Sequence, residues 1–83
     1  MKYRDHKGSL SDSMDTVIDV NSPSEIISHL NKFYNQFGKE VGDIKFEYCG
    51  FDDRIGWDTY YVLVRLNGSE EYRINGMTDG IFS

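Results

Sequence analysis

The sequence of 83 residues contains a single cysteine, Cys49, and a single proline, Pro23. One cysteine cannot form a disulfide within the chain, so the cysteine content does not indicate an oxidising compartment. No apolar run approaches the roughly 20 residues of a membrane-spanning helix. The first seven residues also lack the apolar core of a signal peptide. From these absences we expect a cytoplasmic protein that does not contact a membrane.

Basic residues are scarce as well: 9 Lys and Arg stand against 14 Asp and Glu, which leaves a net charge of −5 at pH 7. Nucleic-acid affinity comes largely from Lys and Arg that neutralise phosphates, so this balance disfavours direct binding to DNA or RNA. An acidic surface is compatible with a basic protein partner, and it also serves solubility alone. Aromatic residues, by contrast, make up 14% of the chain and fill a small core efficiently.

The short motifs of common active sites and metal centres are also missing. There is no pair of cysteines for zinc, no glycine-rich phosphate loop and no HExxH sequence. The two histidines, His6 and His29, stand far apart, and His29 lies at the edge of an apolar stripe, where a structural role is the simpler interpretation. A domain this small has little room for an enclosed pocket. We therefore expect a protein that is not an enzyme, with no catalytic residues, metal or cofactor.

One helix is well defined by the sequence, over residues 22–38. Ser22 and Glu25 form a capping box, Pro23 occupies the first helical position, and Gly38 is placed to end the helix. Apolar residues recur between these ends at helical spacing and form one stripe: Ile26, Ile27, Leu30, Phe33, Tyr34 and Phe37. The stripe predicts an amphipathic helix that packs on a sheet.

Strands are predicted on both sides of this helix. Residues 15–20 are rich in β-branched side chains, and residues 44–75 contain alternating segments that predict a meander of three strands. Residues 1–14 lack a clear pattern and are predicted to be an irregular segment. The chain is thus expected to be one α+β domain, residues 1–83, with one helix on an antiparallel sheet in the order β-α-β-β-β.

Two finer predictions concern the core and the last hairpin. The helix residues Ile26, Leu30, Phe33 and Phe37 are expected to meet Phe46, Tyr48, Val62 and Val64 of the sheet. For the last hairpin we predict a three-residue loop with Gly68 at positive φ, because the hydrophobic pattern then places Val62 opposite Tyr72 or Ile74.

Residues 50–58 are the first candidate functional segment, predicted as a long connection that contains three aspartates. Their spacing does not match the alternating ligands of an EF-hand calcium loop. A Trp and an Arg on a loop are common in protein interfaces, and loops often carry function. We therefore predict a partner-binding site made of Asp52, Asp53, Arg54, Trp57 and Asp58.

The N-terminal residues are the second candidate. Arg4, His6, Lys7 and Ser9 gather donors that would hold a phosphate or a carboxylate. The simpler interpretation is a solvated chain end, since termini are usually loose. As a functional site, this cluster would bind a phosphate-containing small ligand.

Two stretches of the chain carry a resemblance. They are KYRDHKGSL at residues 2–10 with Ser13 and Met14, and IGWDTY at residues 55–60 followed by GMTDG at residues 76–80. Together they resemble small proteins encoded by bacteriophages and prophages. The resemblance assigns no catalytic residue, but it implies a counter-defence factor of the anti-CRISPR type, which works by occupying a surface of a host protein.

These observations predict a small non-enzymatic phage-type accessory protein. It would bind and inhibit or modulate a host protein or protein complex, for example a CRISPR-Cas defence system, through the acidic and aromatic segment at residues 52–58. The alternative is a binder of a phosphate-containing ligand through residues 4–9. A homodimer is left open, because a small domain with two sheet edges gains burial by pairing.

Overall fold

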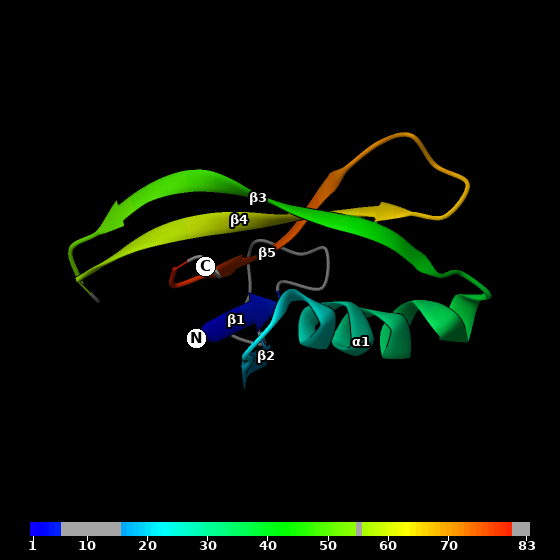
Figure 1. Ribbon diagram of the computed structural model, residues 1–83, viewed down its shortest axis with the longest axis horizontal. Coiled ribbons are helices and arrows are strands. Elements are labelled where there is room, and N and C mark those ends of the chain that lie inside the picture. The colour runs from blue at the N-terminus through cyan, green and yellow to red at the C-terminus, as the bar shows by residue number, and fades with distance from the viewer. Residues whose placement is uncertain (6–15, 55, 81–83) are drawn as a thin grey trace.

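The computed structural model describes residues 1–5, 16–54 and 56–80, and it shows an antiparallel five-stranded sheet with one helix on one face (Figure 1). The elements follow one another as β1 (Lys2–Asp5), β2 (Thr16–Asp19), α1 (Pro23–Tyr34), the 3-10 turn η1 (Asn35–Phe37), β3 (Val41–Asp52), β4 (Trp57–Leu66) and β5 (Arg73–Thr78). The α+β class and the helix on an antiparallel sheet are as predicted. The order is β-β-α-β-β-β, however, so the predicted β-α-β-β-β order is wrong.

The additional strand is β1, which lies in the segment that the sequence analysis described as irregular. The spatial order β2-β1-β5-β4-β3 makes β1 an interior strand. Tyr3 and Asp5 are buried on the side of the helix, while Lys2 and Arg4 are exposed. Four residues are too few to show a periodic pattern, and the partner strand β5 comes from the opposite end of the chain. Sequence analysis missed β1 because its stability comes from these distant neighbours.

The helix begins as the sequence predicts, but the α-helix ends at Tyr34, and a 3-10 turn over Asn35–Phe37 continues to the predicted Gly38. The Glu25 carboxylate accepts a hydrogen bond from the Ser22 backbone N–H at 3.0 Å, which completes one half of the capping box. Pro23 opens the helix, and Gly38 ends the following 3-10 turn in the left-handed conformation with φ of 70°. The local signals at both ends were sufficient to locate this element.

The core lies between α1 and the centre of the sheet. Its buried apolar residues are Tyr3, Val20, Ile26, Leu30, Val41, Val62 and Val64, and Phe46 packs against them. The predicted core positions Phe33, Phe37 and Tyr48 are wrong, because these side chains are 41%, 62% and 58% exposed. In Figure 1 the β4–β5 loop rises away from the last turn of α1, and the outer part of the β3–β4 hairpin extends past the first turn. The sheet and the helix therefore overlap only at their centres.

The β4–β5 connection differs from the predicted three-residue loop. Residues 67–72 separate the strands, and Val62 lies opposite Gly76 instead of Tyr72 or Ile74. Gly68 has the predicted positive φ, at 89°. Tyr72 leaves the strand because its hydroxyl donates to Asp43 Oδ2 on β3 at 2.5 Å. A tight hairpin would hold Tyr72 in the ladder and prevent this contact.

Candidate functional site

The outer part of the β3–β4 hairpin, residues 48–54 and 56–60, projects from the domain, and we call it the hairpin arm (Figure 1). Residues 50–58 were predicted as a long connection, but β3 continues to Asp52 and β4 begins at Trp57. Phe51 lies opposite Asp58, and Asp52 lies opposite Trp57. The prediction failed because Gly50, at φ of 142°, forms an irregularity in the ladder and interrupts the alternation of the sequence. The candidate site is therefore a paired hairpin with a short turn.

The hairpin arm exposes several aromatic side chains. Phe51 and Trp57 are 60% and 61% exposed, and Tyr48 is exposed beside them. The rings of Tyr48 and Tyr60 meet edge to face, with centroids 5.5 Å apart. The register places Tyr48, Phe51 and Tyr60 on the helix side of the sheet and Trp57 on the opposite side. Large aromatic side chains gathered on one projecting element are typical of a protein-binding surface.

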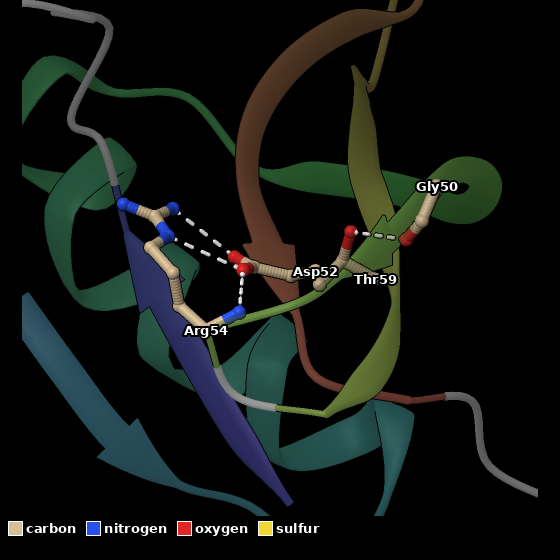
Figure 2. Close-up of polar contacts among 4 residues, drawn as sticks. All are labelled: Gly50, Asp52, Arg54 and Thr59. Atoms are coloured by element: carbon tan, nitrogen blue, oxygen red, sulfur yellow. Dashed lines mark hydrogen bonds and ion pairs between the residues drawn. The ribbon is translucent and has the colours of Figure 1, made fainter.

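The turn of the hairpin arm is held by Asp52 and Arg54 (Figure 2). Arg54 donates to the Asp52 carboxylate from its backbone N–H at 2.9 Å, from Nε at 3.2 Å and from a terminal guanidinium nitrogen at 3.1 Å. The side-chain hydrogen bonds to Asp52 raise the pKa of Arg54, and the nearby charge of Asp52 adds to the effect. Gly56 completes the turn at φ of 75° and donates its N–H to the Asp52 carbonyl at 2.8 Å. The two opposite charges of Asp52 and Arg54 are thus directed at each other.

Two further hydrogen bonds link the two strands of the hairpin arm. The buried Thr59 hydroxyl donates to the Gly50 carbonyl at 2.8 Å and so holds the irregularity in place (Figure 2). The Tyr48 hydroxyl donates to Asp58 Oδ1 at 3.0 Å, and this hydrogen bond raises the pKa of Tyr48. Because Asp58 accepts from Tyr48, the exposed ring has a defined orientation on the arm.

No family model, curated protein or solved structure matches this chain. The functional interpretation therefore depends on the geometry of the arm itself.

The five residues predicted as a partner site all lie on the hairpin arm, although not on one side of it. Asp58 is on the helix side of the sheet, and Trp57 is on the other side. Sequence reasoning did not include Tyr48, Phe51 and Tyr60 in this site. Tyr48 was assigned to the core because it alternates with the residues of β3 that do pack there. The pairing of Phe51 with Asp58 across the arm has no signal in the sequence.

The N-terminal candidate is described only in part. His6, Lys7 and Ser9 lie outside the described residues. Arg4 is exposed on the face of the sheet away from the helix, beside Val17 and Met77 in the register.

His29 has a structural contact that accounts for its place at the edge of the stripe. Its Nε2 atom lies 2.9 Å from Oδ2 of the buried Asp5, which joins α1 to β1. Among the described residues, no group of three His, Cys, Asp or Glu side chains is arranged to hold a metal ion. In the same part of the chain, no helix is long and apolar enough to cross a membrane.

Proposed function

We propose that this chain is a non-enzymatic interaction protein that binds a host protein through the hairpin arm and modulates its activity. The observation that carries the proposal is the exposure of Tyr48, Phe51 and Trp57, each more than half exposed, on one projecting hairpin. Aromatic side chains of this kind supply most of the binding energy at many protein interfaces.

The internal contacts of the arm support this function. The strand pairing, the Asp52–Arg54 contacts and the Thr59–Gly50 hydrogen bond order the arm before any partner is present. A surface that is already ordered loses less conformational entropy on association, so more of the contact energy contributes to affinity.

Charge indicates the chemistry of the partner. Since Asp52 and Arg54 face each other, the acidic character of the arm comes from the exposed Asp53 and Asp58. An acidic margin around aromatic side chains complements a basic protein surface and repels nucleic acid. The resemblance to phage and prophage proteins favours a partner in a host defence system, such as CRISPR-Cas, whose activity the bound protein would inhibit.

The test compares the wild type with a Phe51→Ala/Trp57→Ala double variant. Tagged proteins would capture the partner from host lysate, and the purified partner would then be titrated by calorimetry. Truncation of two interface aromatics should weaken the affinity by about 100-fold or more. Because both side chains are exposed, thermal unfolding should change little.

The matched control is Phe37→Ala, which removes an equally exposed aromatic side chain from the end of the helix, away from the arm. This variant should bind the partner like the wild type. Wild-type affinity in the double variant would show that the partner binds elsewhere and would refute the role of the arm.

A further inference from the structure

β3 is an unusually long edge strand. It spans Val41–Asp52, pairs with β4 on one side, and has no neighbouring strand on the other side among the described residues. The backbone groups along such an edge form a ready template for another strand.

We propose that two copies of this chain form a homodimer by antiparallel pairing of their β3 edges, with the two-fold axis midway between Lys45 and Glu47. This register places Lys45 opposite the partner's Glu47, and by symmetry it places Glu47 opposite the partner's Lys45. The next register in one direction would set Lys45 against the partner's Lys45. The next register in the other direction would place Glu47 opposite the partner's Glu47. Charge therefore selects one register, since opposite charges across a strand pair stabilise it and like charges do not.

The shape of β3 is compatible with this axis. Irregularities interrupt the ladder between Val41 and Asp43 and again between Tyr48 and Gly50. The segment between them, residues 43–48, pairs regularly with β4. The proposed pairing of residues 44–48 lies within this segment, so it is regular in both copies, and the charges of Lys45 and Glu47 select it from its neighbours.

The Ile44 N–H donates to a side-chain acceptor, Asp43 Oδ1, at 2.9 Å. The proposed pairing takes this N–H to lie on the free edge of β3. Ile44 of one copy would form a hydrogen-bonded pair with Tyr48 of the other copy, because the backbone groups of Ile44 and Tyr48, four residues apart on β3, point in the same direction. Lys45 and the partner's Glu47 would then fall at a non-hydrogen-bonded pair, where side chains approach most closely. On pairing, the Ile44 N–H exchanges the Asp43 carboxylate for a backbone carbonyl.

The side chains of the segment fit a second copy on both faces. Lys45 and Glu47 are exposed on the face without the helix, where their ammonium and carboxylate groups would meet. On the helix face, the half-buried Ile44 would pack against the exposed ring of the partner's Tyr48. The two sheets would become continuous, with both helices on the same face and the two hairpin arms at opposite ends. Tyr48 belongs to both surfaces, whereas Phe51 and Trp57 lie outside the dimer interface. Variants of Phe51 and Trp57 therefore test the proposed function, and variants of Lys45 and Glu47 test the dimer.

The test is a charge exchange measured by sedimentation equilibrium. The wild type should reach twice the monomer mass of 9.6 kDa. Lys45→Glu and Glu47→Lys should each give a monomer, because each places like charges opposite one another at both pairs. The Lys45→Glu/Glu47→Lys double variant should again be a dimer, because the pairs return with their signs reversed. Lys39→Glu and Glu71→Lys make the same charge changes at exposed sites off the paired segment and should leave the dimer intact.

Lys45 lies over the Tyr72 ring at 4.1 Å, so its replacement removes a contact within the fold as well. The double variant controls for this loss, because it lacks the same contact and is still expected to dimerise. A second readout is amide hydrogen exchange, in which the Ile44 and Tyr48 N–H groups should be protected in the wild type and exchange faster in each single variant. A wild type that stays monomeric up to about 0.5 mM would overturn the proposal, since this range covers even weak dimers. So would a dimer that survives both single variants, or a double variant that stays monomeric.

Discussion

Tyr3 joins the two ends of the chain through a single side chain. Its ring is fully buried, and its hydroxyl donates to the side-chain oxygen of Asn75, which is itself buried. Burial raises the pKa of Tyr3 far above its usual range, so the hydroxyl remains a hydrogen-bond donor at every physiological pH. Gly76 makes room for this arrangement, because a Cβ at that position would lie only 2.9 Å from Cε1 of Tyr3 and would overlap the Arg4 carbonyl oxygen.

We expect Tyr3→Phe to lower the free energy of unfolding by about 1–3 kcal/mol, because the buried Asn75 amide oxygen loses its donor while the packing of the ring is kept. Urea denaturation followed by circular dichroism would measure the change. Tyr60→Phe is the control, since it removes a hydroxyl from a half-buried ring and keeps the edge contact with Tyr48. Equal stability of Tyr3→Phe and the wild type would show that the Asn75 contact does not stabilise the fold.

At the scale of elements, the helix shows how far local signals extend. Its capping residues and terminal glycine were readable because each acts within a few residues along the chain. The apolar stripe correctly predicts which face of the helix packs on the sheet. It does not predict how much of the helix the sheet covers. Ile26 and Leu30 of the stripe are buried, whereas Phe33 and Phe37 are exposed and contact each other, with ring centroids 5.3 Å apart.

Substitutions along the apolar stripe should therefore lower the free energy of unfolding by different amounts. Leu30→Ala should cost about 2–5 kcal/mol, since it leaves a cavity in the core. Phe37→Ala should cost much less than 1 kcal/mol, because its exposed ring is not part of the core. Chemical denaturation of the two variants would measure both values. Comparable losses in the two variants would mean that the end of the helix is covered in solution.

For the whole molecule, the sheet depends on the meeting of distant segments. β1 pairs with β2 on one side and with β5 on the other, so the N-terminal residues occupy the interior of the sheet. The Val20 N–H donates to the Met1 carbonyl at 2.8 Å, and the Asp79 N–H donates to the Lys2 carbonyl at 3.3 Å. The first five residues thus connect the β3–β4–β5 meander to β2.

Deletion of residues 1–5 should abolish cooperative unfolding, because β2 would lose its only strand neighbour among the described elements and the core would lose Tyr3. Thermal denaturation followed by circular dichroism and by tryptophan fluorescence would show this loss. Lys2→Ala should have little effect, since it removes only an exposed ion pair with Asp19, 2.7 Å long, which holds the pKa of Asp19 below its usual value. A truncated protein that melts as sharply as the wild type would refute the interior role of β1.

Local sequence patterns predicted the α+β class, the start of the helix, and which residues share a face on β3 and β4. Each of these follows from interactions between residues a few positions apart, and such interactions leave periodic or capping signals in the chain. Contacts between distant segments were needed to show that residues 2–5 form a central strand, that Val62 faces Gly76, and that residues 50–52 pair with residues 57–59 in an arm with Tyr48 and Phe51 exposed. These features depend on strand pairing across the molecule and on where the helix stops covering the sheet, and neither is encoded in a local pattern.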